Sequence, residues 1–250
     1  DDGNEDSSTA TSESVTVTVS AVDDTSPVNT VPAAQTVNED TTLVVSGLSV
    51  TDADTSGDLT VTLSVASGTL TIATVSGGAD ITDNGTASVT LVGTATEINA
   101  TLGDSSGVTY QGTLNFNGSD TLTVVTSDGT NSDTDTVAIT VSAVNDAPTL
   151  SGDKAVSVSE GGRVQLTTSD IGYTDVDDGE TEVTFSVTGL SSGSIEVSGT
   201  TATSFTARQL ADGHVYFVHD GTEEASTSFS VSVDDGNEDS STATSESVTV

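Results

Sequence analysis

The sequence predicts an all-β protein made of tandem β-sandwich domains, and three observations support this prediction. First, Val, Ile and Leu alternate with Thr and Ser in short runs that Gly, Asp, Asn and Ser separate. This pattern is typical of half-buried strands joined by turns. Second, residues 234–250 repeat residues 1–17 letter for letter, as DDGNEDSSTATSESVTV. Third, the 250 residues suffice for two sandwiches of about 100 to 120 residues each.

The long-range repeat indicates that the chain comes from a tandem array. We therefore expect residues 1–26 to be the C-terminal strand and linker of a preceding repeat. Within residues 11–22, TSESVTVTVSAV, the alternation places the valines on one face of a strand. We expect residues 1–10 to be ordered only beside a partner module, because an isolated half-hairpin has no sheet to join.

Residues 27–147 are expected to form one complete sandwich. The candidate strands share short runs of alternating apolar residues, and they are residues 41–47, 59–65, 68–74, 87–93, 107–111, 120–128 and 135–144. Residues 94–102 have helical spacing instead. Thr94 and Glu97 stand three residues apart at the start of this segment, which predicts a capping box for a short helix.

Residues 148–250 are expected to form a further sandwich. Its candidate strands show the same alternation, and they are residues 155–159, 181–189, 194–199, 214–220 and 226–234. Comparison with residues 11–22 places residue 250 inside the last strand, so we expect this domain to be truncated there.

Composition narrows the function classes. Three Lys and Arg residues stand against 39 Asp and Glu residues, which gives a formal net charge of -36. Such a charge disfavours nucleic acids and anionic membranes as partners. No cysteine is present, so neither disulfides nor thiolate metal sites can form. No apolar stretch approaches the length that crosses a bilayer, and we expect no membrane insertion.

The acidic residues recur as a set in each domain: a single Glu, then D-x-D, then an Asp near a Gly, then an acidic linker. The members are Asp23 and Asp24 in the first fragment, Glu39, Asp52, Asp54, Asp128, Asn145 and Asp146 in the middle domain, and Glu160, Asp175, Asp177 and Asp234 or Asp235 in the last one. On extended backbone, D-x-D places both carboxylates on the same side. A cation between them offsets their repulsion, and Ca²⁺ suits such mixed oxygen ligands better than Mg²⁺ does.

Other polar residues are expected to have structural roles. Turn-capping is the interpretation that we prefer for Asp83, Asn84, Asp104, Asn117, Asp133 and Asp153. His214 and His219 are separated by an odd offset on a strand, so they face opposite ways and form no metal site. No G-x-S-x-G elbow positions a nucleophile against a base, and we expect no enzymatic activity.

The segments NEDTTL, SVTDAD and AVNDAP resemble the cadherin-like repeats of large bacterial surface adhesins, whose domains are Ig-like sandwiches in elongated arrays. The resemblance implies junctional calcium. One site would use Glu39, Asn145, Asp146, Asp175 and Asp177, with Asp128 as an optional ligand. A second would use Asp23, Asp24, Asp52 and Asp54, completed by Asp2 or Asp1. Glu160 and Asp234 or Asp235 would then serve a following domain.

Residues 156–236 also resemble the cadherin-related repeat of the chondroitin-sulfate-proteoglycan type. The order EGG, D-x-D, FT-x-x-x-L, G-x-V-x-F-x-HDG and F-x-V-x-x-DG is kept. The D-R-E motif of cadherins, which adds two ligands, has no counterpart here. One to three ions for each junction therefore all remain compatible with the sequence.

Together these features predict a calcium-rigidified extender segment of a secreted bacterial surface adhesin of the RTX type, which spaces a binding tip from the cell and supports adhesion and biofilm formation. Its partners would be the neighbouring repeats of the same chain. The alternative is a subunit of a self-assembling extracellular filament or surface layer, in which the orphan N-terminal strand joins an incomplete domain of a neighbouring molecule.

Overall fold

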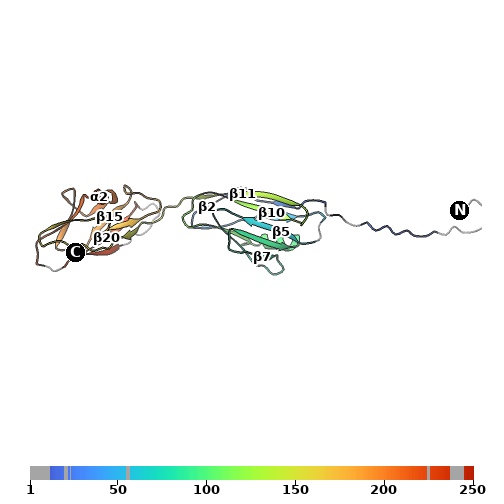
Figure 1. Cartoon of the computed structure of the whole chain (residues 1–250), viewed down its shortest axis with the longest axis horizontal. Helices are drawn as coiled ribbons and strands as arrows, with labels where there is room; N and C mark the ends of the chain where they lie inside the picture. The colour runs from blue at the N-terminus through green and yellow to red at the C-terminus, as the bar shows by residue number, and fades with distance from the viewer. Residues whose placement is uncertain (1–11, 20–21, 23, 55–56, 224–225, 237–244) are drawn as a thin grey trace, which may run out of the picture. The chain divides into compact units, whose positions relative to one another are not determined.

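The computed structural model describes residues 12–19, 22, 24–54, 57–223, 226–236 and 245–250, and its chain divides into two compact units. The first unit is Asp1–Ser142 and the second is Ala143–Val250. Both consist of β-strands with one short helix each (Figure 1). The predicted all-β class with tandem sandwich domains is confirmed.

The larger sheet of the first unit has six strands in the order β2-β11-β10-β5-β8-β7. Its central strands lie side by side (Figure 1). The strand bounds are Gln35–Asn38 (β2), Ser132–Ser142 (β11), Gly118–Ser127 (β10), Leu59–Ser64 (β5), Ser88–Gly93 (β8) and Asp80–Thr82 (β7). All neighbours are antiparallel except β2, which runs parallel to β11.

A three-stranded sheet and a short strand pair complete the first unit. These strands are Thr42–Val44 (β3), Val108–Gly112 (β9) and Gly68–Ile72 (β6), paired in the order β3-β9-β6, and Val28–Thr30 (β1) with Ser49–Thr51 (β4). Leu63 of the larger sheet and Leu70 of the smaller one are fully buried in one core. The alternation of apolar residues thus gives each sheet one inward face.

The helix predicted for the first unit is present as Ala95–Leu102 (α1). The hydroxyl of Thr94 accepts the backbone N–H of Glu97, and the Glu97 carboxylate accepts the backbone N–H of Thr94 at 2.8 Å. The predicted capping box is therefore confirmed. The Thr94 hydroxyl, followed by the Thr94 N–H, holds the pKa of Glu97 below its ordinary value.

The second unit also contains two larger sheets, in the orders β18-β15-β20-β21 and β13-β19-β16-β17, with a separate β12-β14 pair. The strand bounds are Ser204–Thr206 (β18), Thr184–Thr188 (β15), Ser228–Asp234 (β20), Ser245–Thr249 (β21), Arg163–Gln165 (β13), Val215–His219 (β19), Gly193–Val197 (β16), Thr200–Ala202 (β17), Thr149–Ser151 (β12) and Gly172–Thr174 (β14). The helix Ala207–Ala211 (α2) follows β18.

Phenylalanines from both sheets fill the core of the second unit. Phe185 stacks on Phe205 with 5.3 Å between ring centroids, and Phe217 stacks on Phe229 at 6.2 Å. The second pair joins β19 of one sheet to β20 of the other. Offset aromatic pairs of this kind add to the free energy that area burial alone contributes.

Two predicted strands differ from the structure. Residues 155–159 make only an isolated bridge, from Ala155 to Thr249, because this stretch runs past the edge of β21 instead of pairing continuously. Residues 12–19 and 22, the described part of the predicted strand 11–22, form no strand, and their side chains are exposed. An isolated strand has no partner for its backbone groups, so it has no reason to adopt regular pairing here.

The turn-capping role predicted for Asn84 was wrong. Asn84 binds both backbone groups of Ile72 at the end of β6, with its amide oxygen 2.7 Å from the N–H nitrogen and its amide nitrogen 2.9 Å from the carbonyl oxygen. Turn-capping is confirmed for two other residues. The carboxylates of Asp104 and Asp153 accept N–H groups two residues further along. Such bonds stabilise turns locally.

Candidate metal centre

Three carboxylates of the second unit meet in one cluster. Asp175, Asp178 and Asp235 each offer an oxygen, and these oxygens lie within 4.8 Å of one another. Asp235 is buried and the other two side chains are half-buried. Like charges at this separation repel strongly where water is partly excluded. A bound cation would remove that repulsion.

The backbone turn after β14 brings two of these residues together. One carboxylate oxygen of Asp175 accepts the N–H groups of Asp177, at 2.9 Å, and Asp178, at 2.8 Å. The D-x-D segment is therefore a turn built on the Asp175 side chain and not an extended strand. The prediction that Asp175 and Asp177 share one side of extended backbone was wrong, because this turn places Asp178 in the cluster instead.

Linker residues of the same unit contact this cluster and its turn. The side-chain amide of Asn145 donates to Asp235 at 2.7 Å, and the backbone N–H of Asp146 donates to Asp177 at 2.9 Å. Asn145, Asp146, Asp175 and Asp177, which the sequence placed in one set, therefore lie in one neighbourhood. Their role as metal ligands stays a prediction.

The cluster has the features that a hard cation requires. The Oδ2 atom of Asp175 is shielded from solvent and accepts no hydrogen bond from any described residue. A cavity of about 410 Å³, lined in part by Asp175 and Asp178, opens beside it. An ion could therefore take oxygens from three carboxylates and keep some water ligands, which suits the six to eight oxygens that Ca²⁺ accepts.

The first unit binds its own N-terminal segment through an equivalent D-x-D. The Asp54 carboxylate accepts the N–H of Asp24 at 3.0 Å and both the N–H and the hydroxyl of Thr25. Asp52 in turn accepts the N–H of Asp54 at 3.1 Å. The Thr25 hydroxyl, followed by the Asp24 N–H, lowers the pKa of Asp54 from 3.8 to about 2.

Asp128 lies at this same end of the first unit. Its Oδ1 atom accepts the N–H groups of Thr130 and Asn131, both at 2.6 Å, and the Asn131 amide donates to the Thr25 carbonyl at 3.4 Å. The Asn131 N–H is the main cause that lowers the pKa of Asp128. Asn131 was not singled out by sequence reasoning, although the S-D-G-T-N turn would have indicated it.

The optional grouping of Asp128 with Glu39 was wrong. The Glu39 N–H donates to the carbonyl of Ser142 at the end of β11, whereas Asp128 precedes the start of that strand. Eleven residues of β11 therefore separate them, a length of about 33 Å. Glu39 is 4% exposed, and its carboxylate accepts the Asn117 amide at 3.4 Å.

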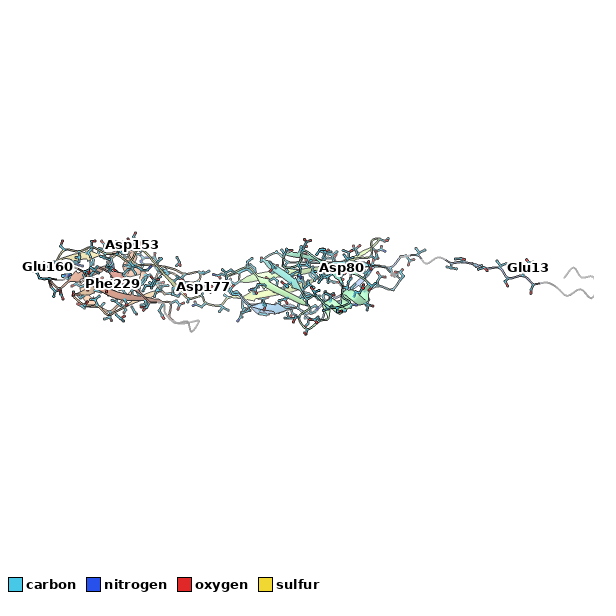
Figure 2. The ribbon with its side chains drawn as sticks, turned by 90° about the horizontal axis from the view of Figure 1, so that it is seen from below. Glu13, Asp80, Asp153, Glu160, Asp177 and Phe229 are labelled. Carbon is cyan, nitrogen blue, oxygen red and sulfur yellow. The ribbon has the colours of Figure 1, made fainter. Side chains whose placement is uncertain are left out.

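The assignment of Asp235 to a following domain was also wrong, because its side chain contacts Asn145 at the linker end of the second unit. Asp234 is paired with Thr184 on β15 and caps the N–H of Gly236. Glu160 is exposed and lies at the opposite end of this unit from Asp177 (Figure 2). Asp1, Asp2 and Asp23 are outside the described residues.

His219 has a structural role in the second unit. Its Nδ1 atom accepts the N–H groups of Gly161, at 3.2 Å, and Gly221, at 3.0 Å. The bond to Gly221 lies within the H-D-G turn of residues 219–221.

Comparison with known proteins shows that the second unit is similar to cadherin-like domains. A family model described as Cadherin-like matches residues 148–249, which confirms the predicted likeness to cadherins for this part of the chain. The search of curated proteins found no match. Within the described residues, neither helix is long and apolar enough to cross a membrane.

Several solved structures are similar to the chain. They include extracellular cadherin domains 1–4 of protocadherin gamma B7 (18% identity, 92% of this chain and 50% of that one, TM-score 0.43), domains 1–4 of Drosophila N-cadherin (18% identity, 90% and 48%, TM-score 0.41) and domains 1–2 of human protocadherin-24 (14% identity, 91% and 96%, TM-score 0.40). The chain spans about half the length of the first two.

Proposed function

We propose that this chain is a calcium-stabilised extender segment of a large secreted adhesin on the bacterial surface, of the RTX type that the sequence resembles. The observation that carries the proposal is the Asp175, Asp178 and Asp235 cluster, with its shielded Asp175 oxygen. The cadherin-like match of residues 148–249 supports an extracellular, tandem-repeat setting. The proposed role is mechanical and involves no catalytic step.

Calcium would act by ordering the linker. Asn145 and Asp146 are hydrogen-bonded to Asp235 and Asp177, and these bonds join the linker to the acidic turn. Without a cation, repulsion among the carboxylates opposes this arrangement. With calcium bound, the attraction of the ion for the same carboxylates would hold turn and linker together. A stiff linker at each repeat would project a binding tip away from the cell.

The expected affinity suits an extracellular setting. Extracellular calcium modules bind with dissociation constants of about 10⁻⁴ to 10⁻³ M. At a free calcium concentration about 100 times the dissociation constant, binding to the folded state alone stabilises it by about 2.7 kcal/mol. Mg²⁺ should stabilise the protein less, because it requires stricter octahedral geometry and dehydrates reluctantly.

The test combines thermal unfolding with small-angle X-ray scattering, with and without calcium, on the wild type and the D175N/D178N variant. We expect calcium to raise the melting temperature of the second unit and to narrow the distribution of particle shapes in the wild type only. D153N/E223Q removes two exposed charges from the same unit and should respond as the wild type does. If calcium changes neither stability nor shape in the wild type, the chain is an acidic spacer without bound ions.

A further inference from the structure

The cavity beside the acidic cluster also has an apolar floor. Its volume is about 410 Å³, and its lining includes Phe185 of β15 and Ala207 and Leu210 of α2. These three side chains are at most 3% exposed. Carbon atoms do not coordinate calcium, which takes oxygen ligands. This part of the cavity therefore suits a ligand with an apolar body and not a bare metal ion.

Tyr173 adds a half-buried aromatic ring to the apolar lining. Its ring centroid lies 6.2 Å from that of Phe185, in an edge-on arrangement. Burial, followed by the nearby Glu180 and further carboxylates, raises the pKa of Tyr173. The phenol therefore stays neutral at physiological pH. A neutral aromatic ring attracts a cation that lies over its face.

Three carboxylates complete the lining, from Asp175, Asp178 and Glu180. The Oδ2 atom of Asp175 accepts no hydrogen bond from any described residue. Arg208 lies 3.9 Å from Glu180, but it contacts Asp212 more closely, at 2.9 Å. The lining is therefore negative as well as apolar, and a positively charged ligand would offset this charge.

From this combination we propose that the cavity binds an organic cation, namely a primary ammonium group on an unbranched apolar chain. The ammonium group would donate hydrogen bonds to the lining carboxylates, and the chain would pack against Phe185 and Leu210. An ammonium group has three donors and no acceptor, which matches a set of carboxylate oxygens. The cavity volume also lies within the range of about 300 to 1,000 Å³ that small-molecule sites occupy.

The first experiment is an NMR titration of the full chain with butylamine, pentylamine and hexylamine. Because Asp175 and Asp178 also belong to the proposed calcium site, the buffer contains no calcium, and the result does not depend on the proposed function. We expect saturable shifts at residues that line the cavity, such as Tyr173 and Leu210. The affinity should rise by about fourfold for each added methylene group, because each one buries more apolar surface.

Hexanol is the matched control ligand, because it has the same apolar chain without the charge. It should bind at least about tenfold more weakly than hexylamine does, since hydrogen bonds to charged groups are the stronger ones. An amine affinity that is independent of chain length would overturn the proposal, because it would indicate attraction to the acidic surface alone. Shifts that do not saturate would overturn it as well.

The same ammonium chemistry occurs in free alkylamines and in the lysine side chain of a partner protein. A titration with Nα-acetyl-lysine methylamide distinguishes these two sources. An affinity equal to that of butylamine supports a lysine side chain as the ligand. A much weaker affinity, with butylamine still bound, supports a free amine.

Two variants test where the amine binds. Ala211 is exposed and lines the cavity at the end of α2, so A211L should reduce the cavity and weaken hexylamine binding by about tenfold. E180Q removes a charge that lies outside the three-carboxylate cluster, and it should weaken binding by about threefold. The controls A138L and E223Q make the same changes at exposed positions away from the cavity. An affinity unchanged in both A211L and E180Q would overturn the proposal.

Discussion

Each unit binds its own N-terminal segment through the second Asp of a D-x-D, but different groups surround this Asp in the two units. In the first unit the Asp54 carboxylate accepts the backbone N–H of Asp24, and in the second unit the Asp177 carboxylate accepts the backbone N–H of Asp146. In the first unit, hydroxyl and N–H donors from Thr25 also bind Asp54. The second unit instead gathers three carboxylates, and within the described residues no such group forms in the first unit.

This difference indicates that D-x-D alone does not define a cation site. In the first unit the Asp54 carboxylate accepts three protein donors, so it can hold the N-terminal segment of this unit without an ion. In the second unit, oxygens of the Asp178 and Asp235 carboxylates lie within 4.8 Å of an Asp175 oxygen, so negative charge is concentrated there. We therefore expect calcium dependence to be concentrated in the second unit.

The largest expected effect on stability comes from a buried hydrogen-bonded carboxylate of the first unit, and it should not depend on calcium. Asp120, which is 5% exposed, accepts the N–H groups of Ala66, Ser67 and Thr121 and the hydroxyl of Tyr110. Burial alone would raise the pKa of Asp120, but these four donors hold it below its ordinary value. D120A would leave buried donors without an acceptor, at a cost of about 3 kcal/mol or more.

Chemical denaturation with and without calcium measures this effect. The first unit of D120A should unfold earlier by the same amount in both conditions, while D80A, which removes an exposed carboxylate from β7, should change stability by less than about 0.5 kcal/mol. A calcium-dependent rescue of D120A would contradict the division between the two units.

The next effect separates the two D-x-D elements directly. D175N/D178N should lose most of the stabilisation by calcium, about 2.7 kcal/mol at a calcium concentration 100 times the dissociation constant. D52N/D54N makes the same chemical change in the first unit and should leave the calcium response of the second unit intact. Calorimetric titration with calcium compares the two variants. An equal loss of calcium binding in both would contradict the proposed difference between the two units.

A smaller effect is expected from the turn that His219 stabilises. H219F keeps an aromatic ring beside Phe217 but removes the acceptor for the N–H groups of Gly161 and Gly221. We expect a loss of about 1 to 2 kcal/mol in the second unit, equal with and without calcium because this turn lies apart from the acidic cluster. H214F, at an exposed position, is the control, and thermal unfolding is the measurement.

The smallest effect is the pH dependence of the linker bond in the first unit. Because the pKa of folded Asp54 is about 2, against an ordinary value of 3.8, its contribution to stability is complete above about pH 4 and is lost as the pH falls through about 2. Titration of the Asp54 carboxyl carbon by NMR should show a midpoint near 2. T25V removes the main cause of the shift, so a midpoint unchanged in that variant would contradict this explanation.

Much of the fold could be predicted from the sequence, because alternation directly reflects burial. Strands such as β5 and β8, and the helix that Thr94 caps, follow the expected segments closely. The short helix α2 was not predicted, although Thr206 and Gln209 form a second capping box. Its five residues are too few to show a helical period.

The site was predictable in composition but not in arrangement. Spacing alone identified Asp175 and Asp177, yet the turn geometry that selects Asp178 depends on a side-chain-to-backbone bond that alternation does not reveal. Strand direction and pairing decide at which end of a sandwich Asp128 and Asp235 lie. Those follow from the completed topology, which a single strand sequence does not specify.

The central claim, that calcium binds at Asp175, Asp178 and Asp235, is tested most directly by an NMR calcium titration of the full chain. We predict saturable shifts in the backbone amides of Asp146, Asp178 and Asp235 at submillimolar to millimolar calcium, with those of Asp24 and Asn131 changing little over the same range. The account is contradicted if the amides of the second unit do not respond, or if both ends respond with one common affinity.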